Sequence, residues 1–249
     1  YKKDEKLFVL GAGSNVLFKD DLFEGAVIKL SKNFSRISLL NENTIIAGSG
    51  AMDKTLSEFA LENCLGGFEF LSCIPGSIGG GIRMNSGCFD SEFKDILISV
   101  QAVNRSGEIL TIPSKEIVFG YRSCNLGKDL IFLSATFKGN IKRKDEIEKE
   151  VNNLKTKKEK AQPTRIKTGG STFKNPIKQT NKKVWEIIKE SVPSDIQFGD
   201  AIISDKHANF FINKNNASYK DMKELIDFVK EKVKNKSGVN LDLEIILVE

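Results

Sequence analysis

The sequence is short of several residue types on which common enzyme classes depend. It has a single histidine, His207, in 249 residues. A zinc enzyme would therefore have at most one histidine ligand. A Ser-His-Asp hydrolase could use only His207 as the base of its triad. The four cysteines include no pair at the close spacing of a zinc or redox motif, so we expect reduced thiols without a disulfide or a metal site.

Long apolar runs are also missing. No stretch approaches the roughly 18 apolar residues needed to span a bilayer, and no secretory signal is visible. We therefore expect a cytoplasmic protein that does not insert into a membrane. The chain begins with Tyr1 and soon enters a strand-like run at 7–10, so we also expect that an N-terminal portion is missing, in which a targeting signal would not be seen.

The excess of positive charge is modest, at a formal net charge of +5. In 142–160, lysine and glutamate alternate, which is typical of a solvated helix face. A nucleic-acid-binding protein usually gathers its basic residues on one face. We therefore expect no nucleic-acid partner, and a positive field that suits a small anionic substrate.

The pattern of apolar residues predicts an α+β fold. In the first half, short apolar runs broken by glycine predict strands at 7–10, 25–30, 43–50 and 129–137, a helix at 53–64, and a hairpin of 96–103 and 108–112. The second half is richer in charge and predicts helices at 141–161 and 181–191, a strand at 207–213 and a last strand at 239–249. The charge shift places a domain boundary near residue 140.

A further long helix is predicted by its ends. Ser218 is followed by Asp221, which is the pattern of a capping box. Apolar residues at helical spacing follow, and Gly238 is expected to end the helix. The expected buried stripe consists of Tyr219, Met222, Leu225, Ile226, Val229 and Val233.

Two glycine-rich segments stand out, GAGSN at 11–15 and IPGSIGGG at 74–81. The first departs from the dinucleotide fingerprint G-x-G-x-x-G because Val16 stands at its sixth position. Glycine allows positive φ and close backbone approach, so each segment could cup an anion with its N–H groups. One such segment is usually only a turn, but two of them beside hydroxyl residues favour the diphosphate of a nucleotide cofactor.

Six motifs occur in order along nearly the whole chain: GAGSNVLF (11–18), LSCIPGSIGGGIRMNSG (71–87), FGYRSCN (119–125), GGSTFKNP (169–176), SDKHANFFIN (204–213) and LDLEI (241–245). Together they closely resemble the UDP-N-acetylenolpyruvoylglucosamine reductase (MurB) family, flavoenzymes of peptidoglycan precursor synthesis. The short link between the third and fourth motifs is similar to the subgroup that lacks an extra substrate-covering loop. The family carries a further βαβ stretch before GAGSN, which fits the expected missing segment.

The resemblance implies an FAD-binding domain of the vanillyl-alcohol-oxidase (PCMH) type at 1–140. A smaller α+β substrate-binding domain at 141–249 would follow, with its last strand returning towards the active cleft. FAD would be held without a covalent bond, its diphosphate by the two glycine-rich segments and its flavin near the MNSG motif. The implied cofactor-binding residues are Gly11, Gly13, Ser14, Asn15, Pro75, Gly76, Ser77, Gly79, Gly80, Asn85 and Gly87.

The resemblance also implies the reaction. NADPH would reduce FAD, and the reduced flavin would pass hydride to the enolpyruvyl group of the UDP-sugar, giving UDP-N-acetylmuramate. The implied catalytic residues are Arg122, Ser171 as proton donor, and Glu244; Lys174 and Asn175 would lie near the substrate.

Taken without the resemblance, the same residues have simpler interpretations. Arg122 could form a structural ion pair, Ser171 could belong to a turn before a helix, and Glu244 could lie on the exposed face of a strand. His207 is expected to position a loop. Basic residues between Lys155 and Arg165 could contact the UDP diphosphate or simply face solvent.

Two other functions remain open from the sequence. One is a different FAD-dependent oxidase of the same fold, for which Cys73 or Cys88 would be candidates for covalent flavin attachment. The other is a non-catalytic nucleotide- or RNA-binding protein that uses the lysine-rich surface. The first would keep the flavin on the protein after denaturation, and the second would be colourless.

Overall fold

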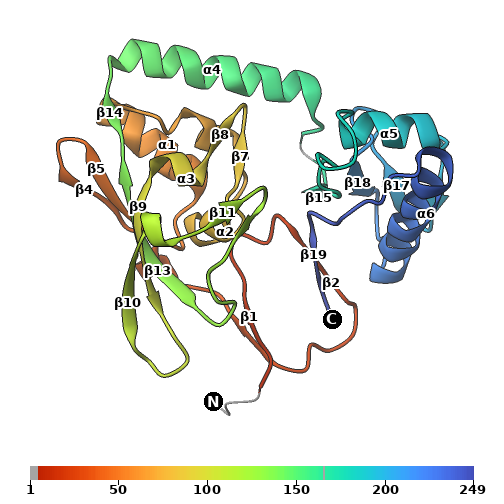
Figure 1. Cartoon of the computed structure of the whole chain (residues 1–249), viewed down its shortest axis with the longest axis horizontal. Helices are drawn as coiled ribbons and strands as arrows, with labels where there is room; N and C mark the ends of the chain where they lie inside the picture. Colours follow the sequence, from red (N-terminus) through yellow and green to blue (C-terminus); the bar gives the residue numbers. More distant parts are fainter. Residues whose placement is uncertain (1–4, 165) are drawn as a thin grey trace. The chain divides into compact units, whose positions relative to one another are not determined.

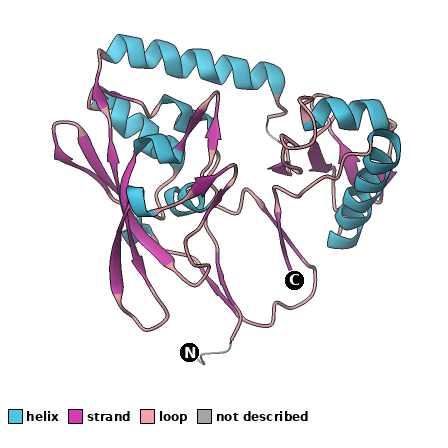
Figure 2. Cartoon of the chain, in the orientation of Figure 1, coloured by secondary structure: helices cyan, strands magenta, loops and turns pink. Residues whose placement is uncertain are grey.

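The structure is a computed structural model that describes residues 5–164 and 166–249, and in it the chain forms two compact units. Unit 1 runs to Gly13 and resumes from Glu24 to Lys158, and unit 2 combines Ser14–Phe23 with Glu159–Glu249. Both units contain helices and strands, which confirms the predicted α+β class (Figure 2). The domain boundary predicted near residue 140 stays a prediction.

Unit 1 is built on a five-stranded sheet with the order β10-β9-β13-β5-β4, in which all neighbours are antiparallel. Its strands are β4 (Ile37–Asn41), β5 (Thr44–Gly48), β9 (Leu97–Val103), β10 (Ile109–Pro113) and β13 (Ile131–Lys138). The predicted β9–β10 hairpin is confirmed. Its turn forms because the Asn104 side-chain oxygen accepts the N–H groups of Ser106 and Glu108, at 2.9 and 3.0 Å.

The helices of unit 1 include α1 (Asp53–Glu62), α2 (Ile78–Arg83), α3 (Phe93–Ile96), and the 3₁₀ turns η1 (Lys32–Phe34), η2 (Glu69–Cys73) and η3 (Ser114–Glu116). α1, α2 and α3 lie to one side of the sheet (Figure 1). The core beneath them is aromatic: the ring of Phe137 packs edge-on against Phe68 and Phe93, with centroids 6.4 and 6.0 Å apart. The predicted helix at 53–64 is confirmed as α1.

Short strands complete unit 1. They are β1 (Leu7–Val9), β3 (Ala26–Ile28), β6 (Leu65–Gly66), β7 (Gly87–Cys88), β8 (Ser91–Glu92), β11 (Phe119–Gly120), β12 (Ser123–Cys124) and β14 (Asn140–Ile141). β1 and β3 pair in parallel, whereas β7–β8 and β11–β12 are tight antiparallel pairs. Gly87 lies in β7, Glu92 in β8, and Arg122 in the turn between β11 and β12.

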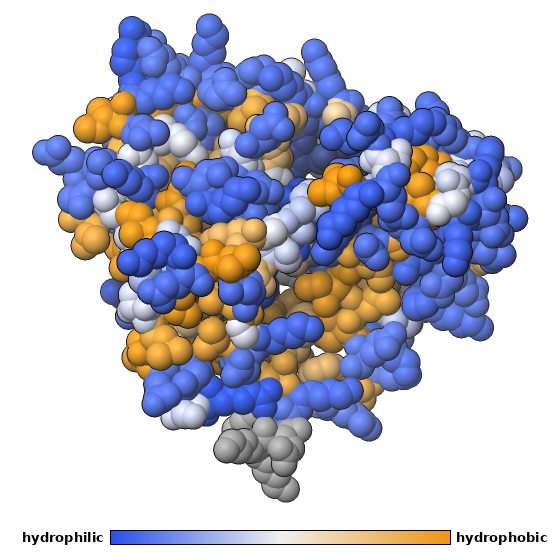
Figure 3. All heavy atoms as spheres, viewed as in Figure 1, coloured by the Kyte–Doolittle hydropathy of each residue, from blue (hydrophilic) through white to orange (hydrophobic). Residues whose placement is uncertain are grey.

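The charged helix predicted at 141–161 is α4 (Lys144–Ala161). It buries only Ile147, Val151 and Leu154, and the rest of its surface is hydrophilic, as Figure 3 shows along the edge where Figure 1 places α4. α4 is long, but its surface is charged. In the described ranges, no helix is both long and apolar enough to cross a bilayer.

Unit 2 contains a four-stranded antiparallel sheet with the order β15-β18-β17-β16. Its elements are β15 (Thr168–Ser171), β16 (Gln197–Phe198), β17 (Ala201–Ile203), β18 (Phe210–Asn213), α5 (Val184–Ser191), α6 (Tyr219–Ser237), and the parallel pair β2 (Val16–Phe18) and β19 (Ile246–Val248). The predicted helix at 181–191 and strand at 207–213 are confirmed. The β16–β17 hairpin was not predicted; its turn contains Gly199 with φ +51°.

Helix α6 has the ends that the sequence predicted. Ser218 Oγ accepts the Asp221 N–H at 3.1 Å, and Asp221 Oδ2 accepts the Ser218 N–H at 2.8 Å. Gly238 follows the helix with φ +73°. Four members of the predicted stripe are buried in the core, namely Leu225, Ile226, Val229 and Val233, while Tyr219 and Met222 are partly exposed.

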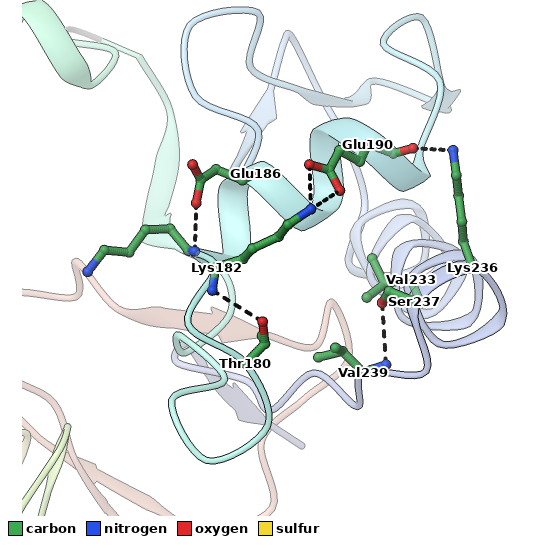
Figure 4. Close-up of polar contacts among 9 residues, drawn as sticks. Thr180, Lys182, Glu186, Glu190, Val233, Lys236, Ser237 and Val239 are labelled. Carbon is green, nitrogen blue, oxygen red and sulfur yellow. Dashed lines mark hydrogen bonds and ion pairs between the residues drawn. The ribbon is translucent and has the colours of Figure 1, made fainter.

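Polar contacts tie α5 to its surroundings (Figure 4). Lys182 Nζ bonds the carboxylate of Glu190 at 2.8 and 2.9 Å across the length of α5. Lys236, from the end of α6, donates to the backbone carbonyl of Glu190. The two helices are therefore fastened at their C-terminal ends in addition to their apolar contact.

The last strand is shorter than predicted. Only Ile246–Val248 forms a strand, whereas residues 239–245 run as irregular chain with one isolated bridge, Phe173 to Leu243. The reason is a bend at Glu244 and Ile245, whose N–H groups both point to the Thr172 carbonyl, at 2.9 and 3.4 Å. Alternation of apolar residues predicted a strand here because buried irregular chain can show the same alternation.

Candidate active site

Gly11 of the first glycine-rich segment lies against the second segment within unit 1. A Cβ atom on Gly11 would come 2.5 Å from Ser77 Oγ, and one on Gly80 would come 3.5 Å from the same oxygen. Gly13 has φ +81°, which disfavours any residue with a side chain. The two segments that the sequence singled out are therefore neighbours, and the Ser77 hydroxyl lies between their glycines.

Several polar atoms beside these glycines are buried without a hydrogen-bond partner. Among the described residues, they include the hydroxyls of Ser77 and Ser49 and both carboxyl oxygens of Asp53. Buried polar groups normally have hydrogen-bond partners. An unpartnered hydroxyl beside a glycine loop is therefore a donor available to a bound ligand. This arrangement fits a phosphate group, because the glycines permit close approach and the hydroxyls can donate to phosphate oxygens.

Asp53 lies directly behind the second segment. A Cβ atom on Gly76 would come 2.5 Å from Asp53 Oδ2, so residue 76 must be glycine while Asp53 stays in place. Burial raises the pKa of Asp53 well above its ordinary value of 3.8, which favours the neutral acid. A neutral carboxyl does not repel an approaching phosphate. No sequence pattern indicated this role, since Asp53 looks like an ordinary first-turn helix residue.

The residues expected near the flavin form one cluster with Arg122. Arg122 Nη2 donates to the Gly87 carbonyl at 2.9 Å. The Asn85 side chain donates to Glu92 at 3.0 Å and to the Gly120 carbonyl at 3.2 Å, and it accepts the Lys94 N–H at 3.1 Å. Asn85 therefore connects the β7–β8 pair to β11 through its side-chain hydrogen bonds.

Glu92 links Asn85 to Arg122, and sequence reasoning missed it. Its carboxylate accepts from Asn85 and lies 4.0 Å from Arg122 Nη1. Arg122 itself has φ +54°, a backbone conformation that costs a bulky residue on the order of 1–3 kcal/mol. Its guanidinium also lies over the Tyr121 ring, 5.1 Å from the centroid. A strained, partly buried arginine held by several partners is typical of a functional residue.

In unit 2, Ser171 and Glu244 lie on adjacent segments. Ser171 ends β15, and the Glu244 N–H donates to the carbonyl of the next residue, Thr172, at 2.9 Å. Gly170 before it has φ +79°, and a Cβ atom placed on it would meet nothing within 4 Å, so the chain in front of Ser171 is open. The main chain thus brings together two of the three residues predicted to be catalytic.

Ser14 and Asn15 belong to unit 2 rather than unit 1. Asn15 Nδ2 donates to the Glu244 carbonyl at 3.0 Å, and the Asn15 carbonyl accepts the Ile246 N–H at 3.0 Å. Asn15 therefore holds the bend that carries Glu244. Its predicted contact with the cofactor diphosphate, like that of Ser14, stays a prediction.

The segment after Ser171 is clamped by a buried asparagine that sequence reasoning missed. Asn209 accepts the Phe173 N–H at 3.0 Å and donates to the Phe173 carbonyl at 2.9 Å. His207 Nδ1 accepts the Asn209 N–H at 3.3 Å, and burial lowers the pKa of His207. This geometry agrees with the loop-positioning role expected of His207. The only signal for Asn209 was a lone amide inside an apolar strand.

Of the two residues expected near the substrate, Asn175 has a clear structural contact. Its side-chain oxygen accepts the Val184 N–H at 3.0 Å, at the start of α5. The backbone of Lys174 donates to the Asp242 carbonyl at 2.9 Å, which adds to the pairing between this loop and the C-terminal segment. Arg165, at one end of the basic stretch considered for the UDP diphosphate, lies outside the described residues.

Two family models match the chain. The FAD binding domain matches residues 1–113, and the C-terminal domain of UDP-N-acetylenolpyruvoylglucosamine reductase matches residues 162–248. The two matches follow the order that the six sequence motifs predicted.

Relatives match over nearly the full length. The UDP-N-acetylenolpyruvoylglucosamine reductase of Pelagibacter ubique is 61% identical over all of this chain and 82% of its own length, and that of Rickettsia conorii is 44% identical over 94% and 78%. The crystal structure of the enzyme (MurB) from Thermus caldophilus is 30% identical, with a TM-score of 0.86 over 99% of this chain and 87% of that one. The chain belongs to the UDP-N-acetylenolpyruvoylglucosamine reductase (MurB) family.

Proposed function

We propose that this chain reduces the enolpyruvyl group of UDP-N-acetylglucosamine enolpyruvate to the lactyl ether of UDP-N-acetylmuramate, as a step in peptidoglycan precursor synthesis. The observation that carries the proposal is the buried, unpartnered Ser77 hydroxyl between Gly11 and Gly80, in a chain whose N-terminal part matches an FAD binding domain. FAD, when bound, accepts hydride from NADPH and delivers it to the methylene carbon of the substrate.

The cofactor is held through unit 1 in this proposal. Ser77 donates to a diphosphate oxygen, and the glycines at 11, 13, 76, 79 and 80 let the backbone approach. Asn85 and Gly87 would line the flavin, and Asn85 would act there through the contacts that it makes with Glu92 and Gly120. Pro75 stiffens the entry to the loop because its φ is fixed.

Arg122 binds the carboxylate of the enolpyruvyl group. Hydride arriving at the methylene carbon pushes negative charge onto the neighbouring carbon and its carboxylate, and a guanidinium stabilises that charge through two parallel hydrogen bonds. The support is the geometry of unit 1: Gly87, Glu92 and Tyr121 hold Arg122 in a strained backbone conformation, so its position is fixed before substrate arrives.

Ser171 donates the proton that completes the reduction. A serine hydroxyl is a weak acid, but it is sufficient beside a carbanion-like carbon when it is correctly placed. Glu244, on the segment paired with Thr172, orients the reacting groups, and Lys174 and Asn175 contribute to substrate binding from the loop that follows Ser171. Lysines from 155 onward supply positive charge for the UDP diphosphate.

We infer that the reaction takes place in the cytoplasm, because reduced nicotinamides and nucleotide-activated sugars are cytosolic metabolites. NADPH is the proposed reductant. The alternative of a covalent flavin oxidase would leave flavin attached to Cys73 or Cys88, and the alternative of a nucleic-acid-binding protein would give salt-sensitive RNA binding without colour.

The test is stopped-flow absorbance on the purified, FAD-loaded protein. NADPH should bleach the visible absorbance of the flavin, and the enolpyruvyl UDP-sugar should then restore it in a separate phase. Acid denaturation should release free FAD. A flavin that NADPH reduces but that this UDP-sugar cannot reoxidise would refute the proposed substrate, and a protein-bound flavin after denaturation would favour the oxidase.

A further inference from the structure

Cys73 and Cys88 lie next to each other in unit 1, and neither belongs to the cofactor or substrate residues assigned above. Cys73 ends η2 and Cys88 ends β7, and these two elements pack together. Cys88 Sγ donates to the Phe70 carbonyl of η2 at 3.3 Å, so the Cys88 thiol lies against the element that Cys73 ends. Both are free thiols in this structure.

The surroundings of the two thiols shift their pKa values in opposite directions. The hydrogen bond with Cys88 lowers the pKa of Cys73 to about 6, and the positive charges of Lys158 and Lys155 act in the same direction. The same contact, with burial, raises the pKa of Cys88. Lys158 is fixed in place because its Nζ donates to the Cys73 carbonyl. These shifts favour the thiolate of Cys73 over that of Cys88, and a thiolate is the reactive form of cysteine.

We propose that Cys73 and Cys88 are a reversible redox pair, which hydrogen peroxide closes to a disulfide. The Cys73 thiolate attacks one peroxide oxygen and breaks the O–O bond, which gives a Cys73 sulfenic acid and hydroxide. The Cys88 thiol then attacks the sulfenic sulfur, forming the S–S bond and releasing water. The two cysteines lose two electrons in total, and the peroxide takes them up. A small thiol such as dithiothreitol reverses the reaction by exchange.

Selectivity follows from exposure as well as from charge. Cys73 is only 6% exposed, so it admits a small oxidant more readily than a bulky alkylating reagent. The lowered pKa of Cys73 favours its thiolate at neutral pH more than the thiolate of an ordinary cysteine. Cys64 and Cys124 lie elsewhere in the same unit and serve as internal references.

The pair is connected to the candidate active site through one peptide. Cys88 directly follows Gly87, whose carbonyl accepts the hydrogen bond from Arg122 Nη2 at 2.9 Å. Closing the disulfide draws Cys88 towards η2 and shifts the Gly87 carbonyl with it. Oxidation therefore displaces the Arg122 guanidinium and lowers turnover, a consequence that rests on the function proposed above for Arg122.

The experiment treats the FAD-loaded protein with hydrogen peroxide and follows two readouts. Peptide mass spectrometry should find a Cys73–Cys88 link with a mass loss of about 2 Da, from the two hydrogens removed, and thiol titration should lose two of the four cysteines. Turnover should fall at least tenfold in parallel and return after dithiothreitol. A different link, or sulfenic acid formed mainly at Cys64 or Cys124, would overturn the proposal.

Three variants separate the steps. Cys88→Ser should stop at a Cys73 sulfenic acid, which dimedone traps once the oxidised protein is unfolded, and should keep its turnover. Cys73→Ser should leave Cys88 unmodified. The Cys64→Ser, Cys124→Ser double variant is the matched control and should form the link at the parental rate. Equal inactivation of Cys88→Ser and the parent would refute the coupling to Arg122. The link is detected without turnover, so a protein that forms it yet fails to reduce the UDP-sugar would refute only the proposed function.

Discussion

The two units hold their candidate site residues in different ways. In unit 1, side chains hold one another: Asn85 bonds Glu92, Glu92 faces Arg122, and Arg122 bonds the Gly87 carbonyl. In unit 2, main-chain hydrogen bonds pair the segments that carry Glu244 and Lys174, and the side chains of Asn15 and Asn209 support this pairing from outside the predicted catalytic set. Substitution of a candidate catalytic residue should therefore disturb several neighbours in unit 1, as at Arg122, but in unit 2 only the chemistry of the altered residue, as at Ser171.

Ser171→Ala should give the largest effect and is the sharpest test of this contrast. Because the backbone of β15 does not depend on the hydroxyl, folding and flavin reduction by NADPH should be nearly unchanged. Reoxidation by the enolpyruvyl UDP-sugar should slow by a factor on the order of 10²–10⁴, the usual contribution of a positioned proton donor. Stopped-flow measurement of both half-reactions checks this, with Ser194→Ala on the exposed surface as control. Equal loss in both halves would contradict the proton-donor role.

Arg122→Lys should give the next largest effect despite retaining its charge. Lysine lacks the planar fork that bonds a carboxylate twice, and it cannot reproduce the contact with Gly87. We expect kcat for the UDP-sugar to fall on the order of 10²-fold. Unlike Ser171→Ala, this variant should also alter the flavin spectrum, because the β7 turn loses a partner. Arg105→Lys on the exposed hairpin turn is the control, and near-parental turnover would remove Arg122 from the catalytic set.

Asn209→Ala tests whether backbone pairing alone positions the Ser171 segment. The variant leaves the buried Phe173 N–H and carbonyl without their side-chain partner, at a cost of roughly 1–3 kcal/mol. Urea unfolding should report that loss, with Asn216→Ala as an exposed control. Activity should fall at the reoxidation step only. An unchanged midpoint would mean that the clamp contributes little to the stability of unit 2.

Asp53→Asn should give the smallest effect, seen in the pH dependence of stability. Burial raises the pKa of Asp53 above 3.8, so the folded protein keeps a proton that the unfolded chain releases above that pH. Stability therefore falls as the pH rises from 3.8 towards the folded-state pKa, and it levels off beyond. Asparagine has no such proton, so the variant should gain stability relative to the parent as pH rises. Unfolding at a series of pH values, with Asp195→Asn as control, measures this slope.

Local patterns in the sequence predicted much of the fold. The ends of α6 and the turn at Asn104 depend on residues a few positions apart, so the sequence displays them directly. The bend at Glu244 was missed because its cause, the Thr172 carbonyl, lies more than 70 residues away in the chain. Alternating hydrophobicity does not distinguish such a bend from a strand.

The residues of the candidate site also fall into two groups, those that local sequence predicts and those that it does not. Glycine-rich loops and family motifs pointed to Gly11, Ser77, Arg122 and Ser171. The residues that support them, namely Ser49, Asp53, Glu92 and Asn209, carry almost no signal in the sequence, apart from the lone amide of Asn209 in an apolar strand, because their importance arises from burial and from distant partners. An acidic residue in a polar stretch looks the same whether it faces water or an arginine.

Unit 2 is not one continuous stretch of chain, because Ser14–Phe23 is part of it and β2 is the parallel partner of β19. A fragment cut at Glu159 would leave Ile246–Val248 with an uncovered strand edge, a site for aggregation. A recombinant that takes this half from a relative must therefore carry two separated pieces of gene. A chimera joined at a single junction would therefore pair β2 of one parent with β19 of the other.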